Sequence, residues 1–261
     1  MKFFDSHSHY FDSRYEEEGI DVYSLLESMF ANNVGYIVNV ATNNANALSC
    51  ISMAQKYENM YTALGIHPSD IDPSANIDRE LFVLQELLRE PKSKAVALGE
   101  IGLDYHFEPY DKELQLKYFN AQLTLSEQLN IPAVIHIRDA HGDAFDTIMK
   151  HKNARGVIHS YSGSPEMATE YVRHGWYISF SGTITFKNAR KVQQSALELP
   201  HDKVLIETDC PYLAPHPYRG RTNNSSYLLY TAEKLGEIWG ISTEEAARIT
   251  SDNAKTLFGI A

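Results

Sequence analysis

The chain has 261 residues, with 34 acidic side chains against 23 basic ones, so its formal net charge is −11 with histidine neutral. Hydrophobic residues make up 43% and charged residues 22%, a balance that is typical of globular proteins and excludes a disordered or fibrous chain. The acidic excess excludes a protein that coats nucleic acid by bulk positive charge, since such binding depends on many Lys and Arg contacts to phosphate.

The cysteines and the first residues indicate a cytoplasmic location. Cys50 and Cys210 are too few for a disulfide framework and match no CxxC metal motif, so a reducing compartment is the simpler interpretation. The N-terminal segment lacks the apolar stretch of a signal peptide, and the chain has no run of about 18 apolar residues. We therefore expect a soluble cytoplasmic protein that is not associated with a membrane.

Eight short apolar runs, rich in β-branched and aromatic residues, predict eight β-strands. Most of them are continuous rather than alternating, as is typical of parallel strands that are covered on both faces. The expected strands are 2–7, 35–40, 61–67, 94–103, 132–137, 156–160, 176–182 and 203–209.

Helical patterns fill the intervals between these runs, with apolar residues spaced three and four apart. The expected helices include 21–33, 78–88, 111–129 and 164–175. The last of these begins with Ser164 and Pro165, a capping residue followed by a first-turn proline, and ends at Gly175.

The alternation of eight strands with helices predicts an α/β chain folded as a (β/α)8 TIM barrel, whose usual size is about 250 residues. An open doubly wound sheet would place a glycine-rich phosphate-binding turn after the first strand. Here that turn is DSHSHYF, which contains no glycine. Because no Gly, Ser or Pro-rich linker divides the chain, we predict a single domain over residues 1–261.

Residues that can bind metal follow the apolar runs at their C-terminal ends, where barrel enzymes place their active sites. His7 and His9 are two apart, so their side chains can point the same way. An HxH pair alone is weak evidence, because chance gives about 0.5 such pairs in a chain of this composition. The other candidates at strand ends are His67, Glu100, His136, His159 and Asp209.

Four of these histidines together with two carboxylates suit a pair of divalent ions such as Zn²⁺, Mn²⁺, Ni²⁺ or Fe²⁺, and Mg²⁺ is less natural with so much imidazole. Two ions about 3.5–4 Å apart can supply a nucleophile at neutral pH and stabilise charge on the attacking and leaving oxygens of a phosphoryl group. No GxSxG motif suggests a serine hydrolase instead.

Several motifs in chain order resemble one known family nearly from end to end. They are DSHSHYF, GIHPSD, ALGEIGLDYH, PAVIHIRDA, VIHSYSG, ETDCPYLAP, RGR and a closing DNAKTLFGI. The sequence resembles the TatD family of metal-dependent deoxyribonucleases, within the amidohydrolase-like TIM-barrel enzymes.

This resemblance implies a role for each candidate. The implied metal ligands are His7, His9, Glu100, His136, His159 and Asp209. Glu100 is implied to bridge the two ions, and Asp209 to act also as the base toward the attacking water, so these two are the implied catalytic residues. The implied contacts to substrate phosphates are His67, Arg138, Arg219 and Arg221. A guanidinium group suits phosphate recognition because its planar fork of N–H donors matches two phosphate oxygens.

One loop departs from the family pattern. Where the family usually has Arg-Asn-Glu-Pro, this chain has Thr222, Asn223, Asn224 and Ser225. Because serine does not fix φ as proline does, we expect a more flexible loop and leave the substrate preference open. Cys210 is expected to be a small buried thiol.

The sequence as a whole predicts a metal-dependent phosphodiester hydrolase. The resemblance indicates a deoxyribonuclease, of the 3′–5′ exonuclease or AP-endonuclease type, that uses a hydroxide activated by two divalent ions (Zn, Mn, Mg or Ni). The expected partner is DNA, contacted over a few nucleotides at ends or single strands, with no obligate protein partner. One alternative is a related barrel hydrolase of C–N, lactone or phosphotriester bonds. The other is a metal-binding protein without catalysis.

Overall fold

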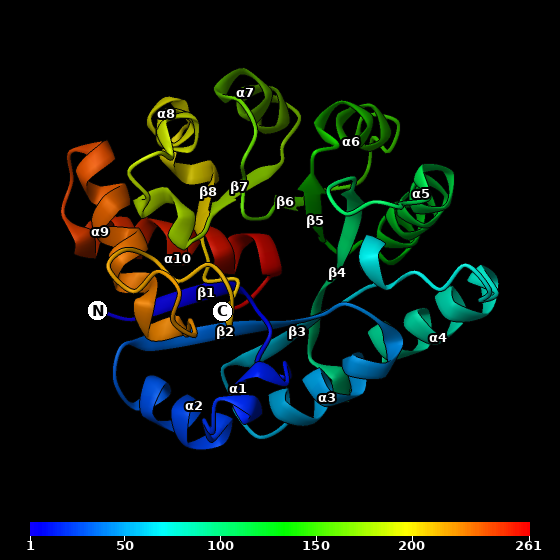
Figure 1. Ribbon diagram of the computed structural model, residues 1–261, viewed down its shortest axis with the longest axis horizontal. Coiled ribbons are helices and arrows are strands. Elements are labelled where there is room, and N and C mark those ends of the chain that lie inside the picture. The colour runs from blue at the N-terminus through cyan, green and yellow to red at the C-terminus, as the bar shows by residue number, and fades with distance from the viewer. The chain divides into compact units, whose positions relative to one another are not determined.

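A computed structural model of the chain describes residues 1–261 and contains all eight expected strands. The strands are β1 (Phe3–Ser8), β2 (Val34–Ala41), β3 (Met60–Leu64), β4 (Ala95–Asp104), β5 (Ala133–Arg138), β6 (Gly156–Ile158), β7 (Tyr177–Phe180) and β8 (Val204–Ile206). They form one sheet in the order β1 to β8 (Figure 1).

Helices follow the strands along the chain, as the (β/α)8 prediction requires. They are α1 (Arg14–Glu17), α2 (Val22–Ala31), α3 (Asn44–Ala54), α4 (Ile77–Arg89), α5 (Lys112–Leu129), α6 (His141–Ile148), α7 (Pro165–Arg173), α8 (Arg190–Glu198), α9 (Leu228–Trp239) and α10 (Thr243–Phe258). The strand order and this alternation confirm the predicted fold class.

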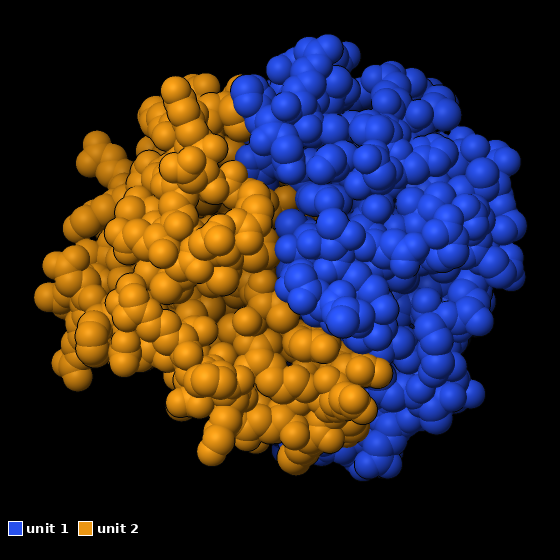
Figure 2. Space-filling model, turned by 180° about the vertical axis from the view of Figure 1, so that it is seen from behind, with its two compact units in different colours: residues 1–39, 159–261 blue, residues 40–158 orange.

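The chain divides into two compact units, residues 1–39 with 159–261 and residues 40–158 (Figure 2). In the first unit, β1 pairs with β2 and β7 pairs with β8, all in parallel. The segment after β8 runs beside β1, because Asp209 N donates to His7 O over 2.9 Å and His9 N donates to Cys210 O over 2.7 Å. Helix α10 packs against both β1 and β8. The end of the chain therefore covers the strand with which it begins.

In the second unit, parallel pairs link β3 to β4, β4 to β5 and β5 to β6. Every residue of β4 from Ala97 to Asp104 is buried, because α5 packs against this strand. This burial explains why the strand has a nearly continuous apolar sequence instead of an alternating one. The metal-binding candidate Glu100 therefore lies in the middle of a fully covered strand.

The helix starts follow the capping chemistry of the sequence. The Ser164 side chain accepts from Met167 N at the start of α7, and Pro165 occupies the first turn, as predicted. Asp111 caps α5 in the same way by accepting from Leu114 N over 2.9 Å. Both cysteines are buried, and Cys210 is the small buried thiol that the sequence predicted. None of the helices combines the length and the apolar character needed to cross a membrane.

Candidate functional site

The first unit brings together four of the predicted ligands, His7, His9, His159 and Asp209, which we call the first cluster. The Nε2 atoms of His7 and His9 lie 3.1 Å apart, and they lie 3.7 Å and 3.3 Å from Asp209 Oδ1. The His7 ring stacks on the His159 ring with centroids 4.0 Å apart. The ligand atoms of His7, His159 and Asp209 lie within 4.8 Å of one another, close enough to hold one metal ion, and His9 lies beside them. Their role as metal ligands stays a prediction.

The backbone around Asp209 is held in an uncommon conformation. Its φ is +57°, in the left-handed region that non-glycine residues adopt at a cost of about 1–2 kcal/mol. Its N–H donates to His7 O, and its carbonyl accepts from Tyr212 N, both over 2.9 Å. Strained positions that the surrounding contacts maintain are typical of functional sites.

The electrostatics of Asp209 keep its carboxylate charged. Burial alone would raise its pKa, but the hydrogen bond from His9 and the charges of His7 and His159 hold the pKa below its usual value. An ionised carboxylate at neutral pH can either bind a cation or accept a proton.

Glu207 is a member of this site that the sequence analysis did not single out. Its side chain is 1% exposed, and Oε1 lies 3.1 Å from His159 Nδ1 and accepts from Ser160 N over 2.7 Å. A carboxylate that holds one ring nitrogen of a histidine fixes the ring orientation and directs the other nitrogen toward a metal. The available signal was that Glu207 is an acidic residue directly after the apolar run of β8, two positions before Asp209.

Replacing Glu207 by alanine is therefore expected to weaken metal binding by about 10- to 100-fold, because His159 loses the partner that orients it. Glu207→Gln is the matched control, since its amide oxygen can still accept from His159 Nδ1 and Ser160 N. A competition titration against a chromophoric chelator measures both affinities. Equal affinities for the alanine variant and the wild type would show that Glu207 does not position the ligand.

A network around Asp5 anchors the first cluster and the loop that departs from the family pattern. The Asp5 carboxylate accepts from Thr208 Oγ1 and from Ser225 Oγ, each over 2.6 Å. Tyr10 OH lies 2.6 Å from Ser225 Oγ and accepts from Ser225 N over 2.9 Å. Burial raises the pKa of Asp5 to about 7, against the hydrogen bonds from Ser225 and Thr208, which lower it. A proline at position 225 could make none of the serine's three contacts, and greater flexibility of this loop stays a prediction.

The second unit brings together His67, Glu100, Asp104 and His136, which we call the second cluster. His136 lies between two carboxylates, with Nδ1 2.9 Å from Glu100 Oε1 and Nε2 3.2 Å from Asp104 Oδ2. His67 Nε2 lies 3.6 Å from Glu100 Oε1. Three of these four residues were predicted from strand ends. Asp104 was not, although it follows Glu100 by four residues and so lies on the same face of β4.

Asp104 is an ionised member of the second cluster. Burial alone would raise its pKa, but hydrogen bonds from His136 and from His106 N, with the charges of His136 and Arg138, lower the pKa below its usual value. With metal bound, Asp104 could therefore orient His136 or share the ligand role with it.

The backbone determines which nitrogen of His67 carries the proton. Ser69 N donates to His67 Nδ1 over 3.1 Å, so the neutral ring bears its hydrogen on Nε2. His67 therefore presents an N–H donor on the side of Glu100. An N–H donor can bind a phosphate oxygen, and the implied contact of His67 with a substrate phosphate stays a prediction.

The three candidate arginines each lie over an aromatic ring. The guanidinium of Arg138 is 4.8 Å from the Phe107 ring centre, and its charge acts on Asp104. Arg219 lies over Phe186 and Arg221 over Tyr218, and both arginines are exposed. Neither makes a hydrogen bond or ion pair with the first cluster. Their predicted contact with phosphate stays a prediction.

The donor types in both clusters fit divalent metal ions. The ligand atoms of His7, His159 and Asp209 lie within 4.8 Å of one another, and so do those of His67, Asp104 and His136. Nitrogen from imidazole combined with carboxylate oxygen suits Zn²⁺, Mn²⁺, Ni²⁺ or Fe²⁺ better than Mg²⁺.

Comparisons with known proteins identify the family of the chain. The sequence model of the family described as TatD related DNase matches residues 4–259. The chain is 39% identical to the uncharacterized metal-dependent hydrolase YabD of Bacillus subtilis, over 98% of this chain and 99% of YabD. It is 34% identical to the uncharacterized metal-dependent hydrolase YcfH of Escherichia coli, over 98% and 95%.

Among solved structures, that of YjjV, a TatD homologue from Escherichia coli K12, is 30% identical and superposes with a TM-score of 0.90. The alignment covers 99% of this chain and 98% of YjjV. The family match, the two curated relatives and this structure all span nearly the whole chain, and the chain belongs to the TatD related DNase family.

Proposed function

We propose that this chain is a metal-dependent phosphodiester hydrolase that acts as a deoxyribonuclease on DNA ends or single strands. The observation that carries the proposal is the pair of buried or half-buried clusters, each rich in imidazole and carboxylate, in the C-terminal halves of strands or directly after them. In a (β/α)8 barrel these strand ends share one face, which is where such enzymes hold their active sites. The relatives' description as metal-dependent hydrolases and the family's description as DNases support the same conclusion.

In this proposal, six residues hold two divalent ions. They are His7, His9, Glu100, His136, His159 and Asp209. When bound, such a pair of ions polarises a phosphoryl oxygen and lowers the pKa of water so that it becomes a nucleophile at neutral pH.

The remaining steps belong to side chains of the protein. Asp209, whose lowered pKa keeps it ionised at neutral pH, is the carboxylate that accepts the proton of the attacking water. The Nε2–H of His67, fixed by Ser69 N, donates to a phosphate oxygen, and Arg138 at the end of β5 supplies a positive charge for the same group. Donors aimed at the oxygens on which charge develops stabilise the transition state more than the ground state.

The net charge of −11 limits how the protein contacts DNA. A chain with an acidic excess repels a long polyanion, so productive contact is restricted to a few nucleotides near the bound cations. We therefore propose weak, metal-dependent affinity for DNA ends or single strands, in the cytoplasm and with no obligate protein partner.

The experiment combines metal analysis of the purified protein with cleavage of labelled single- and double-stranded DNA and RNA, before and after chelation and with Mn²⁺ or Mg²⁺ added back. We expect DNA cleavage that is lost on chelation and restored by metal. Amide and lactone substrates are assayed in parallel. Faster hydrolysis of either of these, undiminished DNA cleavage without metal, or no hydrolysis of any substrate by metal-loaded protein would contradict the proposal.

A further inference from the structure

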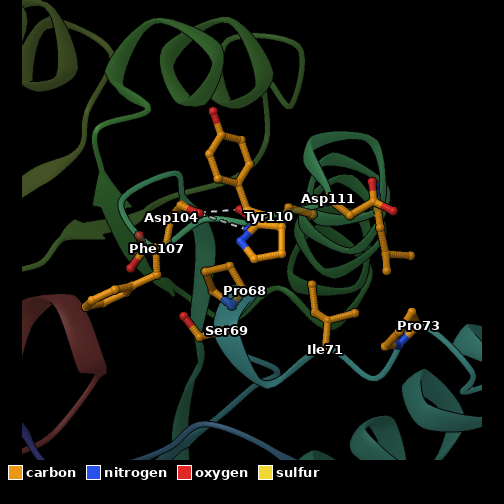
Figure 3. A pocket seen from close by; sticks show the side chains of 11 residues that line it. Pro68, Ser69, Ile71, Pro73, Asp104, Phe107, Tyr110 and Asp111 are labelled. Carbon is orange, nitrogen blue, oxygen red and sulfur yellow. Dashed lines mark hydrogen bonds between the residues drawn. The ribbon is translucent and has the colours of Figure 1, made fainter.

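A cavity of about 330 Å³ opens in the second unit beside the second cluster (Figure 3). Its walls come from residues 68–73, after β3, from residues 104–111, between β4 and α5, and from the first turn of α5. The volume lies within the range of about 300–1,000 Å³ that small-molecule sites occupy.

Two lining residues connect this cavity to the second cluster. Asp104 lines it and contacts His136 Nε2 over 3.2 Å. Ser69 also lines it, and its N–H holds His67 Nδ1 over 3.1 Å. A substrate whose phosphate meets His67 and His136 would therefore place a neighbouring group in the cavity.

The wall between Asp104 and α5 is rigid. Asp104 N donates to Gln115 Oε1 over 2.9 Å, and Gln115 Nε2 donates back to Asp104 O over 2.8 Å. Gln115 is buried at 6% exposure, so both ends of its amide are committed to the backbone of β4. These two hydrogen bonds hold Asp104 against α5 on this side of the cavity.

Apolar and aromatic side chains make up most of the lining. Pro68, Ile71 and Leu114 contribute aliphatic surface, and Phe107 and Tyr110 contribute rings. Figure 3 shows Phe107 and Tyr110 on the segment that follows Asp104, with Pro68 and Ile71 on the opposite segment. Phe107 is 66% exposed, so much of its ring is open to a ligand. An exposed ring beside a cavity is a surface on which a planar group can stack.

The charge of the lining favours uncharged ligands over anionic ones. The cavity carries the carboxylates of Asp104 and Asp111, and none of its 11 lining residues is Lys, Arg or His. Such a wall repels phosphate and carboxylate groups. Asp111 Oδ1 caps α5, which leaves Oδ2 able to accept from an N–H donor. An uncharged planar ring that carries amino groups complements this lining.

The nearby arginine is not one of the lining residues. Arg138 stands over the Phe107 ring at 4.8 Å and is half-buried at the end of β5. Positive charge thus lies beside the cavity and outside its lining. A nucleotide, with an anionic phosphate and a neutral aromatic base, matches this division.

We propose that this cavity binds the base of the nucleotide next to the phosphodiester that is cleaved, with Phe107 and Tyr110 as stacking surfaces and Asp111 as an acceptor for base N–H groups. The inference rests on the proposed function, because it names the part of the DNA substrate that the protein recognises. It predicts a preference for substrates that carry a base at one position relative to the scissile bond.

A binding experiment tests the cavity without catalysis. Chelated protein is titrated with deoxyadenosine 5′-monophosphate and with 2-deoxyribose 5-phosphate, which has the same phosphate and no base, and ligand NMR measures both affinities. We expect the nucleotide to bind about tenfold tighter. The ratio of the two affinities should fall toward one in Phe107→Ala. It should return to the wild-type value in Phe107→Tyr, because tyrosine restores an aromatic ring.

Two further variants complete this experiment. Leu114→Trp fills the cavity and should abolish the difference between the two ligands. Phe82→Ala removes a phenylalanine of similar exposure on α4, 61% against 66%, away from the cavity, and should leave the ratio unchanged. Equal affinities in the wild type, or an unchanged ratio in Phe107→Ala, would overturn the inference. The exposure of Phe107 keeps this variant informative even if Leu114→Trp fails to fold.

A cleavage experiment separates this inference from the proposed function. Metal-loaded protein is given single-stranded oligonucleotides in which one abasic residue is moved position by position. We expect kcat/KM to fall about tenfold when the abasic residue occupies one position, and this fall to be absent in Phe107→Ala. If kcat/KM does not depend on the position of the abasic residue, the proposed base site is wrong and the proposed function is unaffected. If no DNA is cleaved, the proposed function is wrong. The nucleotide titration then shows whether the cavity binds a base.

Discussion

Replacing Glu100 by alanine is expected to lower metal-dependent hydrolysis by about a thousandfold or more while the protein stays folded, because loss of a metal ligand removes several kcal/mol of transition-state stabilisation. Glu100 is 4% exposed, and its Oε1 lies 2.9 Å from His136 Nδ1 and 3.6 Å from His67 Nε2. The substitution removes a negative charge from the centre of the second cluster. It also leaves His136 without the carboxylate that faces its Nδ1 atom.

Three measurements show whether the loss of activity in Glu100→Ala follows from the loss of metal or from unfolding. Metal content per chain should fall together with kcat/KM, and far-UV circular dichroism should match that of the wild type. Glu100→Gln preserves the size of the side chain, so its inactivity would assign the effect to the lost charge and not to a cavity. Glu113→Ala removes an exposed carboxylate from the first turn of α5 and should retain full activity. If Glu100→Gln keeps both its metal and its activity, Glu100 is not a ligand.

The positions of the strands could be predicted from the sequence because burial on both faces leaves a simple pattern. In β4 the eight residues from Ala97 to Asp104 are buried, and a strand of this kind needs an almost unbroken apolar run. The ligand-bearing residues stand out against such runs. His136, for example, is a polar residue inside β5 between Ile135 and Ile137. The fold and most of the candidate ligands were therefore accessible from one chain.

The orienting carboxylates were harder to predict, because their role depends on pairing between distant segments. Asp104 contacts His136, which lies 32 residues later, and the register of β4 with β5 brings the two together. Glu207 contacts His159, from which it is separated by 48 residues. Neither contact can be read from a single sequence. For Asp104 the only local signal was the two-residue alternation along β4.

The loop after β8 illustrates the same difficulty. The sequence showed that Ser225 stands where the family usually has proline, and proline chemistry predicted a looser loop. The structure adds the hydrogen bonds from Ser225 to Asp5 and Tyr10, which lie more than 200 residues away in the chain. A local rule about φ could not include these contacts. The effect of Ser225 on the flexibility of the loop depends on the hydrogen bonds that its side chain makes.

Replacing Gly102 by alanine is expected to lower the free energy of unfolding by about 3 kcal/mol or more, because the change combines an unfavourable φ with a clash inside the sheet. Gly102 has a φ of +145° and pairs with His136 in the register of β4 with β5. A Cβ atom at this position would lie 1.9 Å from the carbonyl oxygen of His136, far closer than any real contact. That atom belongs to the backbone of a buried strand, so it cannot turn aside.

The same substitution is expected to weaken metal binding in the molecules that remain folded. Glu100 and Asp104 lie two residues to either side of Gly102, and both hold His136, so separating β4 from β5 here moves both carboxylates relative to the imidazole. Gly142→Ala is the matched control. A Cβ there meets nothing within 4 Å, and alanine in α6 should stabilise the protein slightly, by about 0.5 kcal/mol. Urea denaturation followed by circular dichroism compares the three proteins, and chelator competition compares their metal affinities. A Gly102→Ala variant with the same stability and the same metal affinity as the wild type would contradict the prediction. It would mean that β4 and β5 can separate at His136 without disturbing the second cluster, which the close pairing of these strands argues against.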